Sequence, residues 1–183
     1  MGIFSKLPPL WGVSIKFGLV AAALNIALML LLFYTGKHPL LIPPYMDGRI
    51  IVFLIFIYFT IREFRDSLNE GILHYWQGFL LGFGVYVTVG ILGSIFVMIF
   101  NSIDPTFLTS YIEKTAAGME AAYDEMVNGP QKVKMSDEQF QQNLTALKAT
   151  TSGILAIDYF IKTCLMGFLV PLIYSVFLRN VPK

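Results

Sequence analysis

The stretch GFLLGFGVYVTVGILGSIFVMIF, residues 78–100, decides the fold class of this chain. It contains no charged residue, and an α-helix of this length, rising 1.5 Å per residue, crosses a hydrocarbon core of about 30 Å. Further apolar blocks lie on both sides of it along the chain. We therefore predict an all-α, polytopic membrane protein with four transmembrane helices, over about 10–34, 44–62, 78–100 and 154–178.

The overall composition supports this class. Hydrophobic residues make up 56% of the 183 residues and charged residues only 14%, against about 25% charged residues in soluble domains. The net charge of +1 provides no basic field for nucleic acid, so we expect none to bind. We predict a single membrane domain, 1–183, with the lipid bilayer as its surroundings.

The second span is the shortest of the four. Its strictly apolar part, residues 50–61, is only about 18 Å long as a helix. Starting the helix at Pro44, because proline suits a first helical turn, and ending it at Arg62 restores a membrane-length span. The alternative is a re-entrant hairpin.

The polar region between the third and fourth spans, about 104–152, predicts two helices. Asp104-Pro105 is a typical helix start, and Ser136-Asp137-Glu138-Gln139 has the spacing of a capping box. Apolar residues then recur at helical spacing along both segments. We predict an extramembrane amphipathic helical hairpin, available to a protein partner.

The even number of spans places both termini on the same side as the 62–77 turn. The cations divide equally, with Lys6, Lys16, Arg62, Arg65, Arg179 and Lys183 on that side and Lys37, Arg49, Lys114, Lys132, Lys134 and Lys148 opposite. The first group lies in short segments, where the positive-inside bias acts. We therefore predict that both termini are cytoplasmic.

Two pairs of charged residues are candidate sites. Asp158 and Lys162 lie one helical turn apart in the fourth span, where an unpaired charge costs about 2.5–3.5 kcal/mol. They form either a self-neutralising pair near the outer interface or part of a proton or ion relay. Asp47 and Arg49, at the outer end of the second span, either join them or are ordinary interfacial charges.

Small residues in the third span form a candidate packing face. Gly78, Gly82, Gly90 and Ser94 follow one i, i+4 line, which only Tyr86 interrupts. Small residues allow the backbone of another helix to approach closely. We predict that this face packs against a helix, either within the chain or in a homo-oligomer or other protein partner.

Catalytic motifs are absent from the sequence. It contains no H-E-x-x-H, G-x-S-x-G, P-loop or C-x-x-C, and its two histidines fall on opposite sides of the predicted membrane. We therefore expect no catalytic residue, no metal, no cofactor and no enzymatic activity.

Several short motifs in a fixed order resemble a known family. They are Ile61-Arg62-Glu63-Phe64, Glu70-Gly71-Ile72-Leu73 and Gln77-Gly78-Phe79-Leu80-Leu81-Gly82, followed by a long helical loop before the last span. The order is similar to that of small bacterial membrane proteins known only as a domain of unknown function. The resemblance implies the bacterial inner membrane, a gene near a polyprenol-phosphate glycosyltransferase and an accessory role in envelope assembly.

Two functions of different classes follow from these features. The first is a non-catalytic accessory or assembly protein that binds other chains through the outer hairpin or the glycine face. The second is a small transporter, or ion- or proton-coupled carrier, that uses Asp158 and Lys162. We favour the first, because the chain has no internal repeat of the kind that transporters commonly contain. A polar cavity that reaches Asp158 would favour the second.

Overall fold

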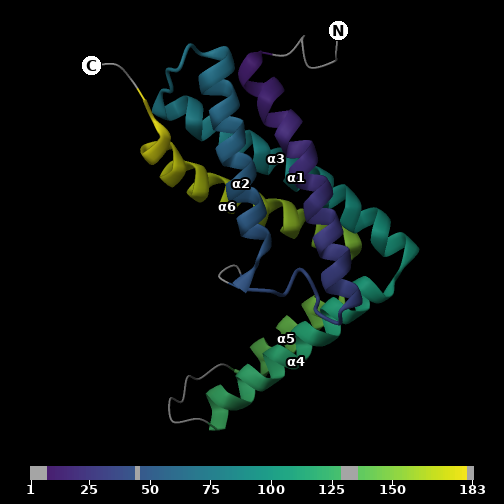
Figure 1. Ribbon diagram of the computed structural model, residues 1–183. Coiled ribbons are helices and arrows are strands. Elements are labelled where there is room, and N and C mark those ends of the chain that lie inside the picture. The colour runs from purple at the N-terminus through teal and green to yellow at the C-terminus, as the bar shows by residue number, and fades with distance from the viewer. Residues whose placement is uncertain (1–7, 44–45, 129–135, 181–183) are drawn as a thin grey trace.

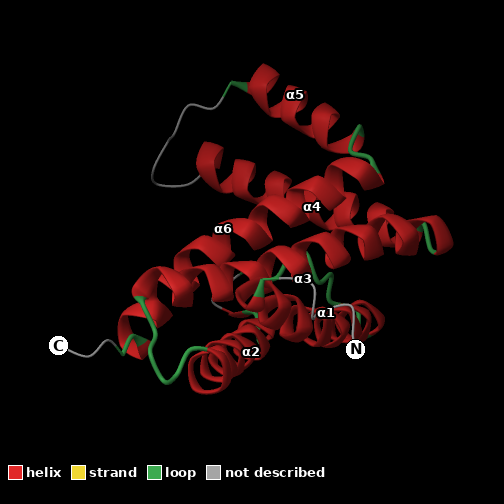
Figure 2. Ribbon diagram, turned by 90° about the horizontal axis from the view of Figure 1, so that it is seen from above, coloured by secondary structure: helices red, strands yellow, loops and turns green. Residues whose placement is uncertain are grey.

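The computed structural model of this chain describes residues 8–43, 46–128 and 136–180, and every regular element in these ranges is helical (Figures 1 and 2). In chain order the elements are α1 (Pro9–Tyr34), α2 (Arg49–Glu63), the π-helical segment η3 (Phe64–Leu68), α3 (Tyr75–Ile103), α4 (Thr106–Asn128), α5 (Asp137–Lys148) and α6 (Ser152–Leu178). The all-α prediction is confirmed for these residues.

Three helices, α1, α3 and α6, are long and apolar enough to cross a membrane, as in a multi-pass membrane protein. They contain 26, 29 and 27 residues, more than the roughly 20 that a bilayer core requires. α1 and α6 agree with the predicted spans to within two residues, and α3 extends the predicted 78–100 by three residues at each end.

The second predicted span, 44–62, differs from the structure. α2 begins at Arg49 and has 15 residues, so it is too short to count among the membrane-length helices. The difference lies at the helix start. Gly48 is the N-cap and offers no capping side chain, and the Asp47 carboxylate accepts a hydrogen bond from the Arg49 N–H at 3.0 Å, which forms a turn just before the helix. Pro44, the expected start, lies outside the described residues. At its other end α2 continues directly into η3.

Contacts between distant segments define two ends of the body formed by α1, α2, α3 and α6. At the terminal end, the backbones of Leu73 and Asn180 exchange two hydrogen bonds. At the opposite end, which we call the α4 end, Lys114 on α4 donates to the carbonyl oxygen of Gly36 at 2.7 Å. The 69–74 turn therefore lies beside the chain that follows α6, and the residues after α1 lie beside α4 (Figure 1).

α4 and α5 extend from the body and lie beside each other (Figure 1). The Asp104 carboxylate accepts hydrogen bonds from the N–H and hydroxyl of Thr106, so α4 begins as the sequence indicates. The Tyr123 and Phe140 rings stack with centroids 4.1 Å apart, and the Tyr123 hydroxyl donates to Asp137. Ser136 precedes α5 as expected, but its side chain makes no capping hydrogen bond within the described residues, so the capping box is wrong.

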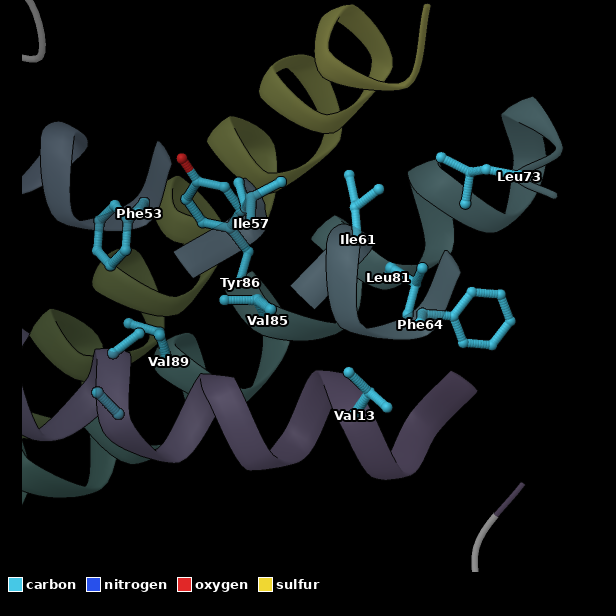
Figure 3. Packing of buried hydrophobic residues seen from close by; sticks show 12 residues of the cluster. Val13, Phe53, Ile57, Ile61, Phe64, Leu73, Leu81, Val85, Tyr86 and Val89 are labelled. Carbon is cyan, nitrogen blue, oxygen red and sulfur yellow. The ribbon is translucent and has the colours of Figure 1, made fainter. Parts of the chain in front are cut away.

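The core near the terminal end joins α1, α2 and α3 (Figure 3). Ile57, Ile61 and Leu81 are at most 1% exposed. α1 and α2 approach each other in this half, where the Phe17 and Phe56 ring centroids are 6.4 Å apart. The two helices then diverge toward the α4 end (Figure 1).

Candidate functional site

The start of α2 holds a buried ion pair between Arg49 and Asp47. The Arg49 Nη2 lies 2.6 Å from the Asp47 Oδ2, and the Nε donates to the same carboxylate at 2.8 and 2.9 Å. The Nη2 also donates to the carbonyl oxygen of Pro39 at 2.7 Å, which ties the loop after α1 to α2. The two side chains are only 9% and 15% exposed. A guanidinium can be buried at this depth because a carboxylate and a carbonyl oppose it.

A second ion pair lies on α6. The Lys162 Nζ is 2.6 Å from the Asp158 Oδ2, so the two residues pair across one helical turn. Their side chains are 63% and 41% exposed, in contrast to the buried pair on α2. This exposure suits a lysine whose amino group extends toward the interface.

One pocket brings both ion pairs together. It has a volume of about 130 Å³, room for several water molecules. The loop after α1, the start of α2, α3 and α6 all contribute residues to it, including all four charged candidates, Asp47, Arg49, Asp158 and Lys162. This cavity, which we call the ion-pair pocket, therefore reaches Asp158, but most of its accessible lining is apolar.

Two buried polar atoms of residues that line this pocket have no hydrogen-bond partner within the described part of the chain. They are the Arg49 Nη1 and the Tyr86 hydroxyl. Arg49 is 7% and Tyr86 1% exposed. Figure 3 shows the Tyr86 ring between Phe53 and Ile57, with its hydroxyl oxygen pointing away from the α3 backbone. Each atom can donate a hydrogen bond to an acceptor that enters the pocket.

A third buried group connects α1 to α6 beside the same pocket. The Asn25 Nδ2 donates to the Tyr159 hydroxyl at 2.9 Å, and both residues line the pocket. Sequence reasoning missed Tyr86 and Tyr159 as site residues. The one available signal was that Tyr86 interrupts the glycine line of α3.

The glycine face of α3 lies against α6. A Cβ added to Gly78 would lie 2.9 Å from the Ser175 Oγ, and one added to Gly82 would lie 2.8 Å from the Pro171 ring. A Cβ on Gly90 would lie 3.1 Å from the Phe160 ring. The face ends at Ser94, whose hydroxyl donates to the carbonyl oxygen of Ala156 on α6 at 2.9 Å. Within one chain, this face is therefore covered by α6.

His38 joins the loop after α1 to α4. Its Nδ1 accepts from the Leu40 N–H at 3.3 Å, so its Nε2 carries the proton and donates to the Phe107 carbonyl oxygen at 3.0 Å. Burial, and then the positive charge of Lys114, lower the pKa of His38 to about 4 from its ordinary 6.5. Both nitrogens of the neutral ring are thus satisfied, and protonation would remove the acceptor.

Metal-ligating residues do not gather in the described ranges: no group of three or more His, Cys, Asp or Glu could hold an ion there. Comparison with known proteins gives one match. A family model described as "Protein of unknown function (DUF4199)" matches residues 16–180. No curated protein and no solved structure matches the chain.

Proposed function

Because the chain belongs to the DUF4199 family, whose function is unknown, we propose a function from its own geometry. It is a non-catalytic membrane accessory protein that binds a small anionic group in the ion-pair pocket. The single observation that carries this proposal is a pair of donors without a partner among the described residues, the Arg49 Nη1 and the Tyr86 hydroxyl, on residues that line one pocket. A phosphate or carboxylate group would supply acceptor oxygens to both.

The energetic argument is that an unsatisfied donor is costly when it is buried. A buried polar group without a partner costs about 1–3 kcal/mol, and a charged one costs more. The tyrosine hydroxyl could be removed by a phenylalanine of nearly the same shape, so its presence indicates a role beyond packing.

The packing of side chains between the helices favours accessory binding over transport. A carrier needs a route from its site to the opposite face of the membrane. Between the pocket and the terminal end, Ile57, Ile61 and Leu81 are almost completely buried and fill the space between helices. The space between the pocket and the terminal end is thus filled, which suits a protein that holds a ligand rather than one that moves it across the membrane.

A small carrier is the second candidate, and one observation favours it. Asp158 and Lys162, an exchangeable carboxylate and its counter-ion, line the pocket. In this function the Asp158 carboxylate would gain and lose a proton as the anion enters and leaves.

Replacing Tyr86 with phenylalanine tests the binding function. Without added anion, Tyr86→Phe should raise the unfolding free energy by about 1–3 kcal/mol, because it removes an unsatisfied hydroxyl. Tyr159→Phe is the matched control. It deletes a hydroxyl that accepts from Asn25, and it should lower stability by a similar amount.

The same variants are then heated in mild detergent with millimolar inorganic phosphate or acetate. At least one of these anions should raise the melting temperature of the wild-type protein, and Tyr86→Phe and Arg49→Gln should reduce that shift. A Tyr86→Phe protein less stable than wild type without anion would show that the hydroxyl is already satisfied. That result, or shifts that both variants retain, would overturn the binding function.

We also propose that α2 with η3 completes a fourth crossing, in the bacterial inner membrane with both termini cytoplasmic and α4 and α5 forming a hairpin outside. The contacts at the two ends support this topology, since α2 starts near the α4 end and η3 approaches the 69–74 turn. Arg62, Arg65 and Arg179 lie in short segments at the terminal end, as cytoplasmic arginines do.

Cysteine labelling tests the crossing by α2. In a Cys164→Ser background, Lys37→Cys precedes α2 and Ser67→Cys lies within η3, at the far end of α2. Four crossings require that a membrane-impermeant reagent reaches these two positions from opposite sides. Glu113→Cys on α4 should label from the same side as Lys37→Cys. Labelling of positions 37 and 67 from one side would show instead that α2 is re-entrant.

A further inference from the structure

We propose that the groove between α1 and α2 binds the acyl chain of an anionic phospholipid, with the lipid phosphate at the cationic α4 end of the groove. This inference rests on the proposed function, because the lipid phosphate would be the source of the anionic group that Arg49 binds. Arg49 and Asp47 line both this groove and the ion-pair pocket.

The groove results from the divergence of α1 and α2. The helices are joined near the terminal end by the Lys16–Glu63 ion pair at 2.8 Å, and they separate toward the α4 end (Figure 1). The space between them is about 780 Å³. Its lining is mostly apolar, and it includes large side chains that no other part of the described chain covers: Leu31 is 58%, Met46 70% and Ile51 62% exposed.

The α4 end of the groove is positively charged. Three cations, Lys37, Arg49 and Lys114, and one carboxylate, Asp47, line it. That carboxylate is already paired with Arg49, so the two lysines supply the excess charge. His38 adds no charge near neutral pH, because burial lowers its pKa to about 4. The lysine at position 114 is held in place by its hydrogen bond to the carbonyl oxygen of Gly36.

The order of chemistry along the groove matches that of a phospholipid. Lys37 follows the last residue of α1 by three positions, so it lies at the level of the lipid headgroups. Leu28, Leu31 and Leu32 line the groove deeper in the membrane, over about 6 Å of helical rise. When an anionic headgroup lies at the lysines, the acyl chain of the same lipid therefore lies against the leucines. The headgroup and the acyl chain both stay at the membrane depth that they have in the bilayer.

Native mass spectrometry of the full chain in mild detergent, titrated with phosphatidylglycerol or phosphatidylcholine, tests the proposal. The wild-type protein should retain one phosphatidylglycerol in preference to phosphatidylcholine. The Lys37→Gln/Lys114→Gln variant should bind phosphatidylglycerol about 30-fold more weakly, which is about fivefold for each lysine. The matched control, Arg62→Gln/Arg179→Gln, removes two charges at the terminal end and should bind as wild type does.

A second variant tests the groove rather than its charge. Ile51→Trp fills the groove and should weaken phosphatidylglycerol binding, whereas Ile95→Trp, on an exposed face of α3 outside the groove lining, should not. Equal binding by the charge variant and the wild type would overturn the proposal. An equal loss of phosphatidylglycerol binding in the variants and in their controls would also overturn the proposal, because such a loss would indicate general annular lipid.

Inorganic phosphate separates this proposal from the binding function. If phosphate stabilises the protein through Tyr86 and Arg49 while the lipid shows no selectivity, the lipid proposal fails and the pocket function stands. If the lipid selectivity depends on Lys37, Lys114 and Ile51 but Tyr86→Phe changes nothing, the pocket function fails and the groove remains. Failure of both sets of variants would overturn both.

Discussion

Replacing Gly167 of α6 with alanine probes a very close contact between α6 and α3. A Cβ at this position would lie 2.4 Å from the Cβ of Tyr86 and 2.7 Å from its Cγ on α3. Ordinary carbon contacts are about 3.5–4.0 Å, so the atoms must move apart by about 1 Å. The Cβ of Tyr86 is fixed by its own backbone, and no rotamer change can relieve the overlap. The helices themselves must separate.

The expected magnitude combines two opposing effects. Overpacking of a filled core costs about 1–3 kcal/mol, and here it should reach or exceed the upper part of that range. Alanine is better than glycine in a helix by about 1 kcal/mol. We therefore expect Gly167→Ala to lower the unfolding free energy by about 2 kcal/mol.

Gly118→Ala on α4 is the matched control. A Cβ there meets no atom within 4 Å, so only the helical preference acts, and the substitution should stabilise by up to about 1 kcal/mol. At about 2–4 °C per kcal/mol for a chain of this size, the two variants should differ in melting temperature by about 6–12 °C in mild detergent. If Gly167→Ala melts as high as Gly118→Ala, then α3 and α6 do not pack as closely as described.

Three further predictions concern charge, pH and the α4–α5 contact. The pKa of His38 is about 4 in the folded protein and 6.5 ordinarily, so the stability that neutral His38 provides is complete above pH 6.5 and is lost as the pH falls toward 4. Melting curves should show a loss of about 2 kcal/mol between pH 7 and 5, and His38→Gln should flatten this dependence. Asp158→Leu and Lys162→Leu should each lower the stability of the protein more than the double variant does, because each single change leaves one charge unpaired. A double variant that folds but does not complement a deletion strain would favour the carrier function. Phe140→Ala removes the ring that stacks on Tyr123, and limited proteolysis should then cut α5 faster; unchanged cleavage would show that the stacking does not hold the two helices together.

The sequence predicted those parts of the site that depend on neighbouring residues. Asp158 and Lys162 pair as their spacing of one helical turn indicates. The pairing of Asp47 with Arg49 was not predicted, since the sequence analysis took both only as charges at the outer end of the second span. What the sequence could not provide was the pocket between them. Its lining comes from segments far apart in the chain, and its important donor, Tyr86, looked like an interruption in a glycine line.

The second helix is shorter than the membrane thickness predicted. Membrane thickness favoured a start at Pro44, but the Asp47 carboxylate accepts a hydrogen bond from the Arg49 N–H in a turn, and the helix begins at Arg49. The glycine line of α3 shows a different limit. Its spacing predicted that a helix backbone approaches, but nothing in the spacing distinguishes α6 from another chain.

By itself, the sequence determined that α1, α3 and α6 are long apolar helices, because hydrophobicity and helical rise are properties of one segment at a time. Only the tertiary structure decided that α6 covers the glycines of α3, that α1 and α2 diverge, and that Arg49 and Tyr86 line one pocket. The physical reason is that packing depends on which side chains fit against each other across segments far apart in the chain. A local pattern records the size and charge of each side chain, but not the partner it meets.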